Sequence, residues 1–179
     1  MIQPAEFKQG MRRLVSGVSI ITTIEGGVPY GFVATAVTSV SADPIPTLLI
    51  CVNKTVSCHD SIMRSGIFCV NLLAEDDIDV AKTFSSPHLR EQRFANIKWE
   101  TQTTGAPAIS SAIANFDCTV SSKLEVGTHT IFIASIVDIK TRGSVRPLVY
   151  ANGQFESLRA TLPGMDASSD ICARIGKRT

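Results

Sequence analysis

The stretch VSIITTIEGGVPYGFVA, residues 18–34, predicts two β-strands joined by a tight turn. Residues 18–24 are mostly β-branched, which favours an extended strand. Glu25, Gly26 and Gly27 form the kind of turn that connects a hairpin, and the chain returns through residues 30–34. This hairpin predicts an antiparallel sheet as the framework of the fold.

Five further apolar runs predict strands, and three segments predict helices. The strands cover residues 47–52, 67–73, 113–121, 129–139 and 148–151, and the helices cover residues 4–15, 55–64 (before Gly66) and 75–84. Since closure removes exposed edges, we expect a mainly β protein, a closed or nearly closed antiparallel β-barrel with peripheral helices. Residues 85–108 show no period, and a loop of that length is usually functional or packed against a partner.

The composition excludes several classes of protein. The chain has 179 residues, 44% of them hydrophobic, which suits one compact domain, and its net charge of +1 gives no field for nucleic acid or anionic membranes. It shows neither a run of about 20 apolar residues nor an apolar signal core. We therefore expect a cytoplasmic protein that contacts no membrane.

The cysteines and histidines predict neither disulfides nor a metal site. The five cysteines are odd in number and form no CxxC motif, which indicates free, buried thiols. Four ligands at zinc spacing cannot be assembled from these cysteines and His59, His88 and His129. Neither GxGxxG nor a P-loop motif occurs.

Residues 31–41, GFVATAVTSVS, combine strand formers with small and hydroxyl-bearing residues. Small side chains let a backbone approach a flat heteroaromatic ring, and Thr and Ser add adaptable hydrogen-bond donors. An ordinary strand end rich in Thr and Ser has the same pattern, and by itself the pattern favours that interpretation.

Residues 51–57, CVNKTVS, lead from a strand into a helix, and helix N-termini bind phosphate. Lys54 adds a charge there, and Thr55 and Ser57 add hydroxyls. Simple helix capping by Asn53 or Thr55 explains the same residues. His129, at the start of a strand, suits either contact with a nicotinamide or an ordinary core or surface position.

In order and spacing, these segments resemble one family. The landmarks are GVSIITT (17–23), ATAVTSVS (34–41), LICVNK (49–54), FCVNLL (68–73), RF (93–94), GTHT (127–130) and PLVY (147–150). The chain resembles the short-chain flavin reductases with a split-barrel, FMN-binding fold, which include reductase components of two-component monooxygenases. The resemblance covers residues 7–155.

The resemblance implies NADH- or NADPH-dependent reduction of FMN or FAD, with reduced flavin passing to a separate oxygenase. It also implies a homodimer with flavin sites near the subunit interface. It places His129 beside the nicotinamide as the catalytic candidate. The flavin-binding residues that it implies are Thr35, Ala36, Val37, Thr38, Ser39 and Ser41 for the ring, Asn53, Lys54, Thr55 and Ser57 for the ribityl chain and phosphate, and Phe84 and Ser85 as a further wall.

Two features depart from the family pattern. Ile45 separates Pro44 and Pro46, which are adjacent in relatives, and Thr128 stands where many relatives have Asp. We expect a flavin reductase-like domain over residues 1–156 and a C-terminal tail over residues 157–179.

Other functions remain open on the same barrel. A non-catalytic flavin carrier or sensor is one, and a reductase that retains its flavin and serves another acceptor is a second. A pyridoxamine-phosphate oxidase on a related barrel is less favoured, because this chain has no phosphate-binding arginine pattern around residues 53–57. The sequence distinguishes neither FMN from FAD nor NADH from NADPH.

Overall fold

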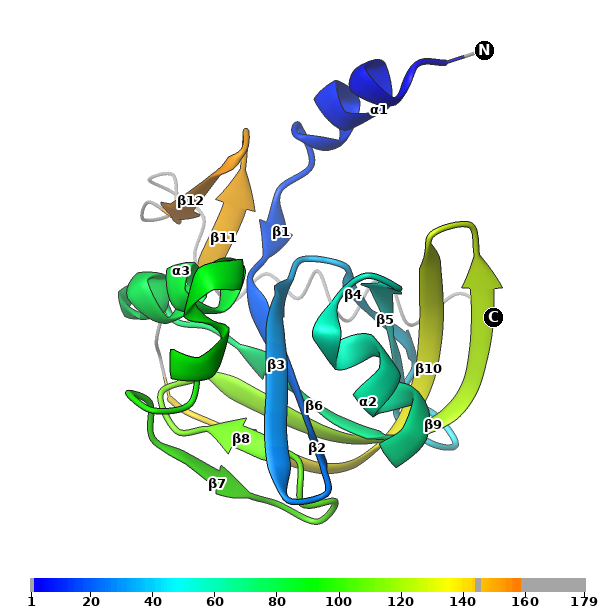
Figure 1. The fold of residues 1–179 in the computed structure, drawn as a ribbon, viewed down its shortest axis with the longest axis vertical. Helices are drawn as coiled ribbons and strands as arrows, with labels where there is room; N and C mark the ends of the chain where they lie inside the picture. The colour runs from blue at the N-terminus through cyan, green and yellow to red at the C-terminus, as the bar shows by residue number, and fades with distance from the viewer. Residues whose placement is uncertain (1, 144–145, 159–179) are drawn as a thin grey trace, which may run out of the picture.

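A computed structural model describes residues 2–143 and 146–158. The described chain forms three antiparallel sheets with helices around them (Figure 1). In chain order the elements are α1 (Pro4–Met11), β1 (Ser16–Gly17), β2 (Ser19–Glu25), β3 (Val28–Ala34), β4 (Val37–Ser41), β5 (Thr47–Asn53), α2 (Ser57–Ser65), β6 (Ile67–Leu72), the 3₁₀ helix η1 (Glu75–Asp77), α3 (Ile78–Ser85), the 3₁₀ helix η2 (Pro87–Gln92), β7 (Trp99–Thr101), β8 (Pro107–Ile109), β9 (Ala114–Val126), β10 (His129–Thr141), β11 (Leu148–Ala151) and β12 (Gln154–Ser157).

The main sheet has seven strands in the order β3-β2-β6-β9-β10-β5-β4. The predicted hairpin is confirmed: β2 pairs antiparallel with β3, and Gly26 and Gly27 adopt positive φ in the turn between them. The sheet curls but is not closed by hydrogen bonds, because β3 and β4 lie at opposite ends of the order. The barrel is therefore of the split type, and full closure was the wrong alternative.

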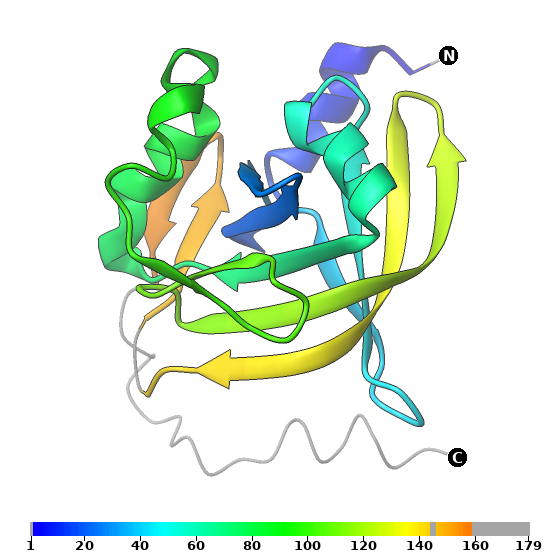
Figure 2. The ribbon, with the colours of Figure 1, turned by 60° about the horizontal axis from the view of Figure 1, so that its bottom comes forward.

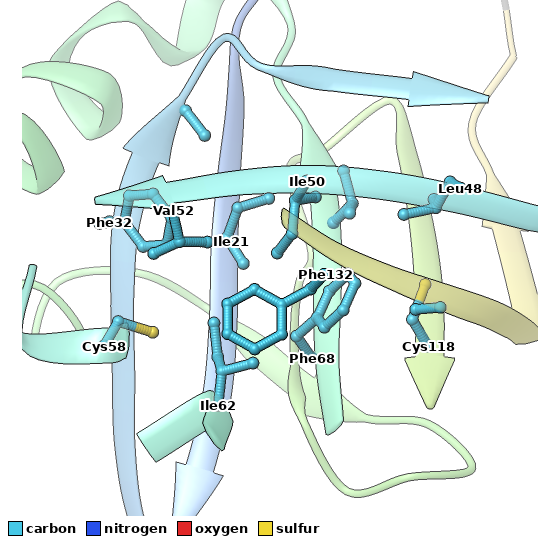
Figure 3. Packing of buried hydrophobic residues seen from close by; sticks show 13 residues of the cluster. Ile21, Phe32, Leu48, Ile50, Val52, Cys58, Ile62, Phe68, Cys118 and Phe132 are labelled. Atoms are coloured by element: carbon cyan, nitrogen blue, oxygen red, sulfur yellow. The ribbon is translucent and has the colours of Figure 1, made fainter. Parts of the chain in front are cut away.

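Strand β2 is buried on both faces because it separates two hydrophobic cores. Ile21 points into the core inside the curled sheet, which α2 covers, whereas Ile20 points into a second core against α3. Figure 3 shows Ile62 of α2 facing Phe68 and Phe132 in the first core. This explains why residues 18–24 are continuously apolar or small rather than alternating, since a strand covered on both faces has no solvent side.

One buried amide holds the centre of the main sheet together. The Asn71 Nδ2 group donates to the Ile20 carbonyl oxygen at 2.9 Å and to the Thr22 hydroxyl at 3.0 Å. Its Oδ1 atom accepts from the Ile109 N–H at 2.7 Å and from the Asn115 Nδ2 group at 2.8 Å. The amide thus links β2, β6, β8 and β9 in a fully buried position, where each unmade bond is costly.

The helices differ from their predicted bounds. Helix α1 ends at Met11 rather than residue 15, and the helix predicted at 75–84 is divided into η1 and α3. The predicted α2 begins later, at Ser57, but Gly66 ends it with φ +69°, as the sequence indicated. The segment 85–108 contains η2 and the short strands β7 and β8, which have too few residues to show a period.

The cysteines within the described residues are free, as predicted, and Cys58, Cys69 and Cys118 are buried. Burial raises the pKa of the Cys58 thiol to about 12 and that of the Cys118 thiol to about 12. These thiols stay protonated and unreactive at neutral pH, because the thiolate is the reactive form. Cys172 and most of the predicted tail lie outside the described residues.

The Asn71 network can be tested by truncation. The Asn71→Ala variant should lose about 3 kcal/mol of unfolding free energy, because four buried groups each lose one hydrogen bond. Urea denaturation measures this loss, and Asn96→Ala, at an exposed position, is the matched control. A loss no larger than that of the control would show that the network contributes little to stability.

Candidate functional site

Strand β3 lies between α2 and α3, and both helices contact it (Figures 1 and 2). Two cavities of about 240 and 230 Å³ open along this strand and share Val33 and Ser85. The first extends to the N-terminus of α2, and the second extends to Tyr150 and Phe155. We refer to these two adjoining cavities together as the β3 groove.

The floor of the β3 groove depends on the glycine at position 31, which has no side chain. A Cβ atom at Gly31 would lie 2.8 Å from Cε1 of Phe84 and 3.1 Å from the Ile21 carbonyl oxygen. The first distance is shorter than real Cβ contacts and the second is unusually tight, so a side chain at position 31 would force the Phe84 ring to shift away from β3. Phe84 is 1% exposed and lines the groove from below, beside Ser85 at the end of α3.

The N-terminus of α2 faces the same groove. Its N-cap residue is Val56, which has no side-chain oxygen, so no side chain caps the first N–H groups of the helix. Thr55 and Ser57 line the groove at this end. The capping alternative is therefore wrong for Asn53 and Thr55: Asn53 Oδ1 accepts bonds from the N–H and the hydroxyl of Thr55, both at 2.9 Å, in the turn before the helix.

Two arginines add positive charge beside the α2 N-terminus. Arg93 is only 7% exposed; it donates to the Gly31 carbonyl oxygen at 2.6 Å and to the Ser86 carbonyl oxygen at 3.1 Å. Its Nε atom is buried without a partner, and its guanidinium carbon lies 5.8 Å from the centre of the Phe84 ring. Within the described residues neither Arg93 nor the neighbouring Arg90 forms an ion pair.

Burial lowers the pKa of Arg93 from its usual range, but an arginine stays protonated at neutral pH. A buried cation without a carboxylate partner costs free energy unless an anion approaches it. The free helix N-terminus and the two arginines therefore make this end of the groove suitable for phosphate. A flavin phosphate fits this arrangement.

Asn53 and Lys54 line neither the β3 groove nor the larger cavity next to it in the described part of the chain. The Lys54 ammonium group donates to the Glu125 carboxylate at 2.5 Å, which lowers the pKa of Glu125. Lys54 therefore points towards the β9–β10 hairpin rather than into the β3 groove. Of the four residues predicted around the phosphate, the structure places Thr55 and Ser57 in the groove.

The predicted ring-binding loop lies at the junction of two cavities. Thr35 lines both the β3 groove and a larger cavity of about 690 Å³, which Ala36, Val37 and Thr38 also line. Ser39 and Ser41 lie further along β4, exposed and outside every cavity. Ser41 instead donates its hydroxyl to the Asp43 carbonyl oxygen at 2.6 Å.

His129 is exposed at the start of β10 and lines none of the cavities. Antiparallel pairing sets it opposite Asn53, so it lies near the residues that lead into α2. Its Nδ1 atom lies 2.9 Å from the Thr128 hydroxyl.

Several residues line the β3 groove without having been predicted from the sequence, among them Arg90, Arg93, Tyr150 and Phe155. Arg93 was part of a recognised landmark, RF (93–94), but burial without a counter-ion appears only in three dimensions. Tyr150 also ended a landmark, and its edge-to-face contact with Phe155, at 5.5 Å, depends on the pairing of β11 with β12.

In residues 2–143 and 146–158, no helix is long and apolar enough to cross a membrane. The same residues contain no group of three or more His, Cys, Asp and Glu side chains that could hold a metal ion.

Comparison with known proteins identifies the family. The family described as "Flavin reductase like domain" matches residues 11–159, which is most of the chain. The chain belongs to the flavin reductase family. The resemblance noted in the sequence is thus confirmed.

Flavin reductase relatives of known name are similar over most of their length. The FMN reductase (NADH) RutF of Pseudomonas syringae is 38% identical over 157 residues, covering 88% of each protein. BorF, the flavin reductase component of a bacterial two-component tryptophan halogenase, has a TM-score of 0.81 at 30% identity, covering 89% of this chain and 100% of its own. The NADH:FAD oxidoreductase SgcE6 of Streptomyces globisporus, solved with NAD and FAD fragments, has a TM-score of 0.81 at 26% identity, covering 93% and 99%.

The Gly31–Phe84 contact makes a direct prediction. Gly31→Ala should destabilise the protein by about 2 kcal/mol or more and weaken flavin binding, because the new methyl group pushes the Phe84 ring from the groove floor. Thermal unfolding and flavin titration measure the two effects. Gly10→Ala, in α1 with no atom within 4 Å of the added carbon, should be neutral or slightly stabilising. Equal behaviour of the two variants would contradict the close contact.

Proposed function

We propose that this protein is an NAD(P)H:flavin oxidoreductase that reduces FMN or FAD and supplies reduced flavin to a separate monooxygenase component. The observation that carries the proposal is the β3 groove, where a helix N-terminus without a side-chain cap, small residues and a buried arginine that forms no ion pair within the described residues lie along one strand. Family membership over residues 11–159 supports the same activity.

The chain's own residues supply binding and orientation. Ser57 and the α2 N-terminus would hold the flavin phosphate with Arg90 and Arg93, while residues 35–38 would approach the ring through their small side chains and backbone. A flavin held there would supply the hydride-accepting chemistry, so the protein's own residues would contribute binding and orientation rather than a nucleophile. Phe84 and Val33 form an apolar wall that excludes water from one side.

His129 is the proposed contact for the nicotinamide. Its exposure at the start of β10 leaves the imidazole accessible, and its register opposite Asn53 keeps it near the phosphate-binding end of the site. Thr128, whose hydroxyl lies beside Nδ1, would orient the imidazole ring.

A homodimer is also proposed. Helix α1 stands away from the body of the protein (Figure 1) and carries no buried residue. Its Phe7 and Met11, with Leu14 beyond its end, are exposed by 63, 48 and 59%. Exposed apolar side chains that are contiguous in the chain are typical of subunit interfaces. A second copy that covers α1 would also cover the larger cavity next to residues 35–38, because Met11 and Leu14 line it.

The activity can be tested with purified protein. Flavin combined with NADH or NADPH should give nucleotide oxidation. The loss of absorbance at the nicotinamide band measures this oxidation. Kinetics that saturate with added flavin indicate a released product, whereas activity independent of added flavin indicates a retained one. Tight flavin binding with no oxidation for any pairing would instead identify a carrier or sensor.

The role of His129 predicts a separation of two measurements. His129→Ala should reduce kcat/KM for NAD(P)H by about tenfold while changing the flavin Kd by less than about twofold. His88→Ala, at an exposed position on η2, is the matched control. Equal loss of flavin binding and nucleotide use would show that His129 is structural.

The phosphate site predicts a difference between two neighbours. Ser57→Ala should weaken flavin binding about fivefold, the effect of one lost hydrogen bond of about 1 kcal/mol. Lys54→Gln should have a smaller effect, because Lys54 is already paired with Glu125. Fluorescence titration of both variants decides the matter, and a larger effect at Lys54 would show that its side chain turns to the phosphate on binding.

A further inference from the structure

A further cavity, which we call the outer chamber, adjoins the β3 groove at its phosphate end. It has a volume of about 390 Å³, within the range of about 300–1,000 Å³ usual for small-molecule sites. Ser57, Arg90 and Arg93 line both cavities. A molecule held by its phosphate at the α2 N-terminus therefore has a direct path into the outer chamber.

The junction between the groove and the outer chamber carries more positive charge than one phosphate group requires. The α2 N-terminus and the buried Arg93 already suit a single phosphate, and Arg90 adds a second guanidinium group without an ion pair in the described part of the chain. Guanidinium groups bind phosphate oxygens in pairs through their planar fork. Two arginines side by side therefore suit a pyrophosphate better than a monophosphate.

The walls of the outer chamber suit a nucleoside. Tyr30 and Phe94 present aromatic surface, and Pro29 adds a flat apolar ring, so a purine base can stack against them. Glu91 is the one carboxylate of the lining. It repels a phosphate at its own position but accepts hydrogen bonds from ribose hydroxyls, as acidic residues do in dinucleotide sites.

We propose that the outer chamber binds the adenosine phosphate half of FAD, so that FAD is the preferred flavin. This inference rests on the proposed function, because it places the flavin mononucleotide half in the β3 groove. The nicotinamide dinucleotide carries the same adenosine phosphate. We assign the chamber to FAD because it continues directly from the phosphate end of the groove.

Equilibrium binding tests the inference without turnover. Quenching of flavin fluorescence by the purified full chain should give a Kd for FAD at least about tenfold below that for FMN. AMP should displace bound FAD, whereas ribose 5-phosphate at the same concentration should not, since it lacks the base. Equal Kd values for the two flavins would overturn the proposal while leaving the flavin reductase function intact; binding of neither flavin would instead reject the function itself.

One substitution isolates the outer chamber. Glu91→Ala should raise the Kd for FAD about fivefold and leave the Kd for FMN unchanged, because Glu91 lines the chamber but not the groove. Asp76→Ala, another exposed carboxylate, is the matched control and should change neither value. If Glu91→Ala raises the KM for NADH and leaves the Kd for FAD unchanged, the chamber serves the nicotinamide nucleotide and the assignment to FAD is wrong.

Discussion

The close contact of the Phe84 ring with the backbone of Gly31 is the constraint on which the rest of the candidate site depends. It brings α3 so close to β3 that a Cβ atom at position 31 would displace the Phe84 ring. Arg93 completes the arrangement, since it donates to the Gly31 carbonyl oxygen and lies near the Phe84 ring. Strand, aromatic ring and cation are thereby fixed together, and the groove above them takes its shape from all three.

The electrostatics of the site follow from this arrangement. Arg93 is buried by its neighbours, yet its two hydrogen bonds go to neutral carbonyl groups rather than to a carboxylate. The charge of Arg93 is therefore not neutralised by the described protein, and it lies at the end of the groove where α2 begins. By contrast, Lys54 is neutralised by Glu125. Whether a charged side chain is available to a phosphate thus depends more on its direction than on its distance in sequence from the helix N-terminus.

The proposed activity requires binding and orientation from the protein rather than acid–base groups. A protein that holds a flavin and a nicotinamide together contributes orientation and fixed donors, while the cofactors supply the reactivity. Two small cores on either side of β2 provide the rigid support, and the site lies where their covering helices meet β3. Surface left exposed on α1 adjoins the larger cavity, which is why dimerisation and ligand binding are proposed together.

The sequence by itself determined the antiparallel sheet, the β2–β3 hairpin and the C-terminal end of α2 at Gly66, because β-branched runs and glycines act locally on the backbone. It also identified the family, through landmarks whose order a folded domain preserves. The family resemblance already implied a split barrel, whereas only the tertiary structure decided that β7 and β8 form a separate pair. It alone gave Arg93 its burial without a counter-ion and turned Lys54 towards Glu125. These features depend on contacts between residues far apart in the chain, such as Gly31 and Arg93, and no local pattern encodes such contacts.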